Sequence, residues 1–172
     1  MFRWIPVPRL NAPYSDMETV SEDLEYVGFW PRVAASIIDG VLIGLVTWPV
    51  GTAVYGMDYW TSGSVMLGAW DFLLSWVVPA IAVITFWIFR QSTPGKMAVS
   101  ARIVDARTGG AAKAGQYVGR YLSYFVAAIP LFVGIFWIAF DRRKQGWHDK
   151  MAGTVVVRQR RAGREPVSFS NG

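Results

Sequence analysis

The sequence predicts an all-α integral membrane protein, and its composition is the first reason. Of the 172 residues, 53% are hydrophobic and only 17% are charged, whereas soluble domains carry about 25% charged residues. The hydrophobic residues gather in long runs, two of which can cross a bilayer as helices. The length suits one domain. The absence of cysteine excludes a disulfide framework and any cysteine-based metal or redox site.

The first 27 residues form a polar tail with two capping-box patterns, Ser-Asp-Met-Glu and Thr-Val-Ser-Glu. These patterns allow a short surface helix at about Met17–Val27, and a solvated tail is the alternative. No continuous apolar core followed by a cleavage site occurs here, so no signal peptide is expected. We therefore place the membrane domain at residues 28–157.

Two apolar segments are predicted to be transmembrane helices. The first runs from about Pro31 to Tyr55. The second, Phe72 to Phe89, has 18 residues without a charge, which makes a helix of about 27 Å. Pro79 is expected to kink this second helix. Most of the nine tryptophans lie near the ends of apolar segments, which is typical of an interfacial aromatic belt.

A third apolar segment, Tyr117 to Phe140, is interrupted by Pro130 and Gly134. Residues 56–71, between the first two helices, include no Lys or Arg, whereas the stretches before and after the third segment are rich in both. Since Lys and Arg concentrate on the cytoplasmic side, the N-terminus and both basic stretches are predicted to be cytoplasmic. This favours a re-entrant helical hairpin that turns at Pro130; a third crossing is the alternative.

Two short tracts in the cytoplasmic part have the composition of β-strands, Val99 to Asp105 and Gly153 to Arg158. An isolated strand leaves backbone groups unpaired, so we expect the two tracts to form a small two-stranded β element in a cytoplasmic cap. Residues 158–172 are expected to be a disordered basic tail.

Asp39 lies within the first predicted helix, seven residues after Arg32. About 10 Å separates the two along a helix, too far for a direct ion pair, so each needs another partner. A carboxylate at this depth costs about 2.5–3.5 kcal/mol, and such residues mostly face a cavity or a partner. Asp39 therefore either pairs with a cytoplasmic cation or belongs to an ion or solute pathway. The candidate cations are Lys96, Arg102 and Arg120.

The polar stretch at residues 141–150 contains the only histidine of the chain. His148 and Asp149 offer a titratable pair near physiological pH, and they join Arg32 and Asp39 as candidate pathway residues. One histidine gives no multi-histidine metal site, and no HExxH, GxSxG or P-loop motif occurs. We therefore expect no enzyme activity, metal or cofactor. The expected headgroup anchors are Arg142, Arg143, Lys144 and Lys150, and the expected structural polar cap is Lys96, Arg102, Asp105, Arg120 and Asp141.

Ser36, Gly40 and Gly44 form a small-xxx-small stripe on the first helix, which would let another helix approach closely. We therefore expect a homo-oligomer or a subunit of a membrane complex. The net charge of +5 comes from residues that flank apolar segments. This distribution suits anionic lipid headgroups and not a nucleic acid, for which no motif is present.

Three motifs, in this order, make the chain resemble the RDD family of small membrane proteins over about Val27 to Val157. They are GFWPRVAASIIDG, STPGKMAVSARIVDARTGG and DRRKQGWHDKMAGTVVV. The family is named for one arginine and two aspartates. The resemblance implies that Arg32 is the arginine and Asp39 the first aspartate, with Asp149 favoured over Asp105 as the second. It also implies a bacterial protein with a suggested role in transport, while some members act as accessory subunits of membrane assemblies.

The functional expectation is a multi-pass protein of the cytoplasmic (inner) membrane that transports an ion or small solute. Its polar site would lie around Arg32 and Asp39. The alternative is a non-transporting scaffold or accessory subunit of a membrane complex.

Overall fold

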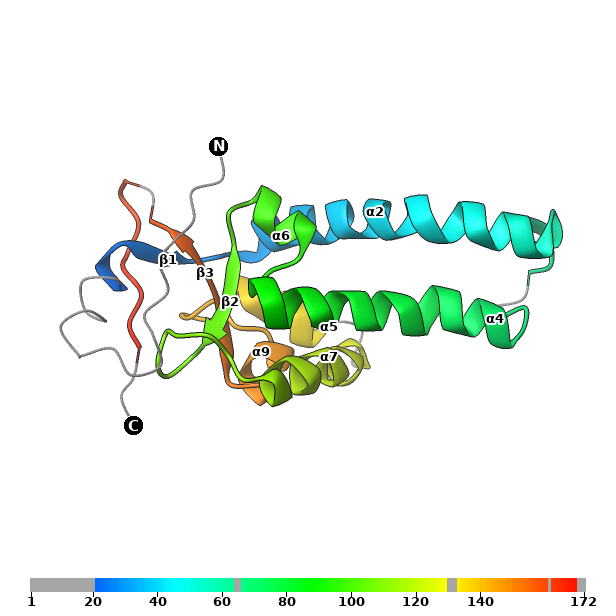
Figure 1. The fold of residues 1–172 in the computed structure, drawn as a ribbon. Coiled ribbons are helices and arrows are strands. Elements are labelled where there is room, and N and C mark those ends of the chain that lie inside the picture. Colours follow the sequence, from blue (N-terminus) through cyan, green and yellow to red (C-terminus); the bar gives the residue numbers. More distant parts are fainter. Residues whose placement is uncertain (1–20, 64–65, 130–132, 161, 170–172) are drawn as a thin grey trace.

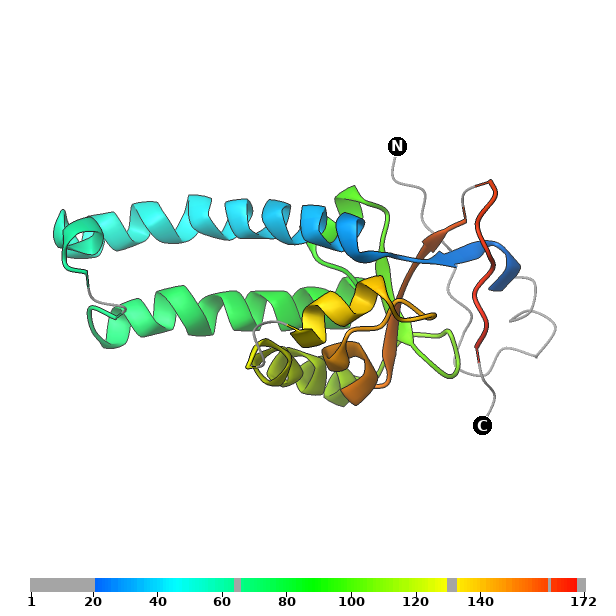
Figure 2. The ribbon, with the colours of Figure 1, turned by 180° about the vertical axis from the view of Figure 1, so that it is seen from behind.

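The computed structural model describes residues 21–63, 66–129, 133–160 and 162–169 of the chain. Most of these residues are helical. Two long helical columns run side by side from a cap that contains a small β-sheet, as Figure 1 and Figure 2 show from opposite sides. The short helix α3 (Asp58–Thr61) lies in the connection at the far end of these columns.

The first column is α2, Phe29–Tyr55, and it confirms the helix predicted at Pro31 to Tyr55. Its 27 residues are long and apolar enough to cross a membrane. Much of its apolar surface faces outward: Ile37, Leu45 and Val46 are 61%, 64% and 63% exposed. Exposed apolar side chains on such a helix require lipid or another protein around them.

The second column is a continuous helix of 22 residues, Ala69–Arg90, long and apolar enough to cross a membrane, which confirms the second predicted helix. It consists of α4 (Ala69–Phe72), the π-helical turn η1 (Leu73–Val77) and α5 (Val78–Arg90). Pro79 lies at the start of α5. Proline has no amide hydrogen to donate to the carbonyl four residues earlier, so the ladder of hydrogen bonds is interrupted there. A π-helical turn ends two residues before Pro79, where a kink was expected, and Ala69–Arg90 remains one helix.

The third apolar segment is bent. Between helix α7 (Ala114–Ala128) and the pair α8 (Val133–Phe136) and η2 (Trp137–Ala139) the helical direction bends by 116°. Pro130, the expected turning point, lies outside the described residues. Gly134 packs closely on α7, because a Cβ there would lie 2.9 Å from the Cα of Ala127. The two helical pieces therefore lie against each other.

The sheet has three antiparallel strands in the order β1-β3-β2, not the two that the sequence predicted. Strands β2 (Arg102–Asp105) and β3 (Thr154–Gln159) pair with each other, as expected. The additional strand is β1 (Leu24–Tyr26), which pairs with β3. The predicted surface helix is therefore wrong at its C-terminal end, while residues 17–20 lie outside the described part. Tertiary pairing with the second edge of β3 prevails over the local capping pattern.

The two faces of β3 carry two hydrophobic clusters. Val156 faces a cluster with Trp87 of α5 and Tyr117 of α7. Val155 and Val157 face the other cluster, where Val167 and the partly buried Phe169 cover them. Full burial of a valine side chain contributes about 1.5–3 kcal/mol.

Residues 162–169 therefore differ from the disordered tail that we expected after Arg158. Val167 is only 3% exposed. The amide of Val167 donates to the carbonyls of Ser21 and Leu24, at 3.3 and 3.2 Å. The apolar face of the sheet orders this segment, which by composition alone is polar.

Candidate functional site

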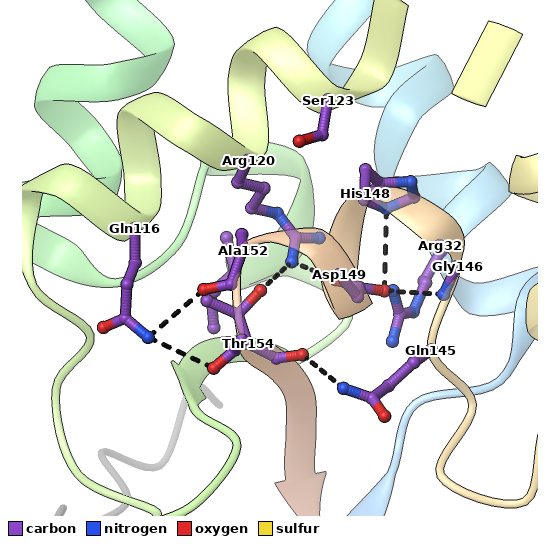
Figure 3. Close-up of polar contacts among 12 residues, drawn as sticks. Arg32, Gln116, Arg120, Ser123, Gln145, Gly146, His148, Asp149, Ala152 and Thr154 are labelled. Carbon is purple, nitrogen blue, oxygen red and sulfur yellow. Dashed lines mark hydrogen bonds and ion pairs between the residues drawn. The ribbon is translucent and has the colours of Figure 1, made fainter. Parts of the chain in front are cut away.

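Asp149 lies between two arginines that come from distant parts of the chain (Figure 3). It stands on the short helix α9 (Trp147–Met151). Arg32, at the start of α2, places Nη1 2.5 Å from Asp149 Oδ2. Arg120, on α7, forms an ion pair with Asp149 Oδ1. Arg120 and Asp149 are fully buried and Arg32 is 7% exposed, so this Arg32–Asp149–Arg120 cluster is shielded from solvent.

The two guanidinium groups also hold backbone and side-chain acceptors. Arg32 donates from Nε to the carbonyl of Val27 at 3.0 Å and from Nη2 to the carbonyl of Lys144 at 2.7 Å. Arg120 Nη1 donates to Oγ1 of Thr154 at 2.7 Å. Since Thr154 begins β3, the cluster fixes the sheet to the helices. The planar fork of arginine suits such multiple donation.

The charge of Asp149 is maintained by its neighbours. Burial alone would raise the pKa of the Asp149 carboxyl, but the adjacent Arg120 and Arg32 outweigh it and hold this pKa well below its usual range. The amide of Gly146 donates to Asp149 Oδ2 at 3.0 Å, which caps α9. A buried ion pair that loses one partner destabilises a protein by about 3–5 kcal/mol, so this carboxylate is a structural charge.

His148 is buried and does not titrate near physiological pH, contrary to the expectation. Its ring stacks on Tyr124, with 3.9 Å between centroids and 20° between planes. Burial lowers the pKa of His148 to about 3, in spite of Asp149, whose Oδ2 lies 3.5 Å from Nε2. Among the described residues neither ring nitrogen has a hydrogen-bond partner.

Asp39 is bound by neutral groups, and an ion pair with a cytoplasmic cation, one of the two alternatives for it, is not found among the described residues. Its Oδ2 accepts from Oγ1 of Thr93 at 2.5 Å and its Oδ1 from the amide of Gly95 at 2.7 Å. Both donors lie at the beginning of α6 (Pro94–Ala98). A Cβ on Gly95 would lie 2.0 Å from the carbonyl oxygen of Ala35, so glycine is needed for α6 to reach Asp39.

Lys96 and Asp39 both contact the hydroxyl of Thr93. Lys96 Nζ donates to Oγ1 of Thr93 at 3.5 Å and lies 5.6 Å from the centroid of the Trp87 ring. Burial lowers the pKa of Lys96. Arg120 lies over the same indole ring, 5.5 Å from its centroid. Cations at such distances are stabilised by the face of an aromatic ring.

The other expected cap residues are dispersed. Asp105 accepts from the amides of Arg107 and Thr108 and from Nε2 of Gln116, each at 2.8–2.9 Å, and these hydrogen bonds outweigh burial and lower its pKa. Asp105 thus holds a turn apart from the cluster. Arg102 is buried in β2. Asp141 forms an ion pair with Lys150.

The expected headgroup anchors have different environments. Arg142 and Lys150 are exposed. Lys144 is half-buried and donates from Nζ to the carbonyl of Ala139 at 3.1 Å. Arg143 is half-buried and donates from Nη2 to the carbonyls of Ala106 and Ser168, at 2.6 and 3.1 Å. Arg143 therefore ties the C-terminal segment to the cap, which makes it a poor headgroup anchor.

The small-residue stripe of α2 does not form the closest helix contact. Ser36 and Gly40 are exposed, and a Cβ on Gly40 would meet nothing within 4 Å. Gly44 is covered by Trp48 of its own helix. A close approach between helices lies elsewhere, where Gly95 of α6 meets the backbone of Ala35.

The sequence analysis did not predict several residues of the site. Thr93 and Gly95 bind Asp39, and Tyr124 stacks on His148. Thr93-Pro94 is a recognisable signal, since threonine is a common N-cap and proline suits the first helical position. Tyr124 offers no such local signal. Within the described part of the chain, no three His, Cys, Asp or Glu residues gather as a metal site.

The fold and the site define a small helical protein with two apolar helices of bilayer length, joined to a β-containing cap by a buried arginine–aspartate–arginine cluster. The chain belongs to the RDD family, whose model matches residues 26–153. This membership and the apolar helices together point to a membrane protein.

Two relatives are described only as uncharacterized proteins. RP437 of Rickettsia prowazekii (strain Madrid E) is 41% identical over 75 residues, which are 44% of this chain and 41% of the relative. YxaI of Bacillus subtilis (strain 168) is 26% identical over 148 residues, which are 76% of this chain and 95% of the relative. The match thus covers less than half of the Rickettsia protein. No solved structure matches the chain.

Proposed function

We propose that this chain is a multi-pass protein of the cytoplasmic membrane with its N-terminus and cap in the cytoplasm. Helices α2 and α4–α5 would cross the bilayer. The distribution of Lys and Arg supports this orientation: residues 56–71, at the far end of both columns, include neither, whereas the segments of the cap are rich in both.

The third apolar segment would enter the bilayer from the cytoplasm and return to it. The 116° bend between α7 and α8–η2 supports this. At the start of α7, Gln116 Nε2 donates to the carbonyls of Ala152 and Gly153, both at 3.2 Å. Since α9 follows η2, the segments on both sides of the bend lie at the cap. A straight crossing would separate them by the thickness of the membrane.

The function that the geometry supports best is that of a non-transporting scaffold or accessory subunit of a membrane complex. One observation carries this proposal: the Arg32–Asp149–Arg120 cluster is buried and joins α2, α7 and α9. These charges pair with one another inside the protein and hold its elements together, so they are not presented to a transported solute. The exposed apolar face of α2, with the Ser36 and Gly40 stripe, would then bind a second copy or another membrane protein. The expected contact of the cap with anionic headgroups belongs to the same proposal.

Transport remains the second candidate because of one observation. Asp39 lines a cavity of about 250 Å³ between α2 and α5. The other lining residues are almost all apolar, and Leu42, Val46 and Val83 are among them. A carboxylate beside such a cavity suits a cation only if the cavity becomes hydrated.

A flux assay in liposomes that contain a pH-sensitive dye distinguishes the two candidate functions. Wild type and Asp39→Asn are reconstituted and exposed to Na⁺, K⁺ or proton gradients, after size-exclusion chromatography has shown that both are folded. The scaffold proposal expects no gradient-driven flux from either. Flux that is lost in a well-folded Asp39→Asn variant would support transport instead.

The proposed association through the exposed face of α2 is tested separately. Gly40→Leu fills the stripe without a clash in the protomer, since nothing lies within 4 Å of a Cβ at Gly40. It should abolish self-association or the retention of a stoichiometric partner in mild detergent. Val41→Leu, on the exposed surface of the same helix, is the control. Unchanged association in Gly40→Leu contradicts the assigned interface.

We also propose that the chain is neither an enzyme nor a binder of nucleic acid. His148 supports the first part, because its ring is buried between Tyr124 and Asp149 and is neutral at physiological pH. The position of the basic residues beside apolar helices supports the second.

A further inference from the structure

A cavity of about 450 Å³ lies beside the Arg32–Asp149–Arg120 cluster, between the first turns of α2 and the α8–η2 segment. One side is apolar and includes Ile37 and Phe136, which are 61% and 54% exposed. These two side chains belong to the apolar surface that a bilayer would surround. In the membrane placement proposed above, this side of the cavity would face the acyl chains.

The inner end of the cavity is lined by Arg32, Lys96 and Arg120, together with His148. Asp149 neutralises part of this charge. Asp39 is near enough to Lys96 to oppose the lowering of the Lys96 pKa by burial, and both contact Thr93. Even with Asp39 included, the three cations are balanced by only two carboxylates, Asp39 and Asp149. The inner end of the cavity thus keeps a positive charge in surroundings where unpaired charge is costly.

Lys96 is the cation at this end with the weakest partner. Among the described residues, Lys96 Nζ makes no ion pair, and its one hydrogen bond is the 3.5 Å contact with Thr93. Lys96 is 7% exposed and lines the cavity, so a ligand there can reach it. Buried charged groups normally have strong partners, and a ligand with acceptor oxygens would supply one.

We propose that this cavity binds one anionic phospholipid, with its phosphate against Lys96 and Arg32 and the start of an acyl chain against Ile37 and Phe136. The inference rests on the membrane placement proposed above. A phosphate carries a negative charge and several acceptors, and charge-assisted hydrogen bonds to it are the strong ones. Its acyl chain matches the apolar wall. Basic pockets at the cytoplasmic end of membrane helices are suited to such headgroups.

This site differs from the general attraction between a basic surface and a membrane. The exposed Arg142 exemplifies that attraction, which any anionic lipid satisfies without occupying a defined place. The cavity, by contrast, holds one headgroup, and its cations are 7% exposed or less. Binding is therefore expected to saturate at one lipid per chain and to depend on the shape of the cavity.

The test uses the full-length protein in a neutral detergent, with native mass spectrometry to count bound lipids and a thermal shift to measure stabilisation. The probes are dioleoyl-phosphatidylglycerol, dioleoyl-phosphatidylcholine and inorganic phosphate. We expect one phosphatidylglycerol per chain, bound about tenfold more tightly than phosphatidylcholine, since one charge-assisted contact corresponds to about that factor. Equal affinity for the two lipids overturns the proposal. Stabilisation by inorganic phosphate equal to that by phosphatidylglycerol also overturns it, because the apolar wall would then be irrelevant.

Two pairs of variants locate the site. Lys96→Gln should weaken phosphatidylglycerol binding about tenfold, whereas Arg142→Gln, with the same change in charge, should leave it unchanged. Ser36→Phe fills the cavity from its exposed rim and leaves every cation in place. Ala34→Phe adds nearly the same bulk to an exposed position of the same helix outside the cavity.

Ser36→Phe should lose the bound lipid and Ala34→Phe should retain it, which decides the matter even if Lys96→Gln does not fold. Wild-type binding by Ser36→Phe, or equal losses in Arg142→Gln and Lys96→Gln, contradicts the site. Failure of this lipid test leaves the flux and association tests of the scaffold unaffected, because the residues that those tests replace, Asp39 and Gly40, do not line this cavity.

Discussion

Arg32 and Asp149 are 117 positions apart in the sequence, yet Arg32 Nη1 lies 2.5 Å from Asp149 Oδ2. The other oxygen of the same carboxylate forms an ion pair with Arg120. The start of the first apolar helix, the third apolar segment and the cap therefore meet at one buried charge. Any movement of the cap away from α2 would leave charged groups without partners, which is unfavourable in a low-dielectric interior. The cap and the helices are thus expected to unfold together.

Replacement of Asp149 tests this coupling most directly. Asp149→Asn leaves two buried guanidinium groups with only neutral acceptors, and the free energy of unfolding should fall by about 3–5 kcal/mol. Denaturation in detergent micelles, followed by tryptophan fluorescence, measures it. Asp58→Asn, in the exposed helix α3, is the control and should change stability little. If Asp149→Asn is as stable as wild type, the ion pairs do not hold the cap.

His148 should make stability depend on pH. Burial lowers its pKa from 6.5 to about 3, so between these pH values the unfolded chain binds a proton that the folded protein excludes. The free energy of unfolding therefore falls as the pH decreases from about 6.5, by at most about 1.4 kcal/mol per pH unit. His148→Phe keeps the stacking on Tyr124 and removes the titrating group. Its stability, measured by denaturation at several pH values, should vary less with pH than that of wild type; an unchanged slope would assign the effect to other groups.

Sequence reasoning found the features that hydrophobicity and charge determine. The two long helices followed from apolar runs, and the pairing of β2 with β3 followed from β-branched tracts that needed partners. The need of Arg32 for another partner followed from its distance of seven residues from Asp39, which is too long for a direct ion pair along a helix. The resemblance to the RDD family, carried by three motifs, pointed to Asp149 as the second aspartate.

Features that depend on tertiary contacts could not be found in this way. Leu24–Tyr26 becomes a strand because β3 has a second edge. Val167 is ordered by the apolar face of the sheet. Asp39 binds α6 because Gly95 allows an approach that no pattern of charges indicates. The pKa of His148 depends on burial between segments that are distant in the sequence.

The contact of the C-terminal segment with the sheet is open to a simple test. Val167 is 3% exposed, whereas Ser168, which contributes its carbonyl to Arg143, is exposed. Val167→Asp would bury an unpaired carboxylate and should lower the free energy of unfolding by about 2 kcal/mol or more, or release the segment. Limited proteolysis should then cut near residue 163, while Ser168→Asp remains resistant. Equal resistance of both variants would show that the segment contributes little to the sheet.

Gly95 provides the sharpest test of how α6 joins α2. A Cβ at this position would lie 2.0 Å from the carbonyl oxygen of Ala35 and 2.9 Å from Cγ of Asp39. Gly95→Ala should therefore separate α6 from α2 and break the hydrogen bond from the Gly95 amide to Asp39, at a cost of about 1–3 kcal/mol.

The control for Gly95→Ala is Gly40→Ala. It adds the same methyl group to a helical glycine, but into open space. Alanine has the higher helix propensity, by about 1 kcal/mol, so Gly40→Ala should be neutral or stabilising. Thermal unfolding of both variants in detergent gives the comparison. If Gly95→Ala unfolds at the same temperature as Gly40→Ala, the close contact between α6 and α2 does not exist in the folded protein, and Asp39 must have another partner.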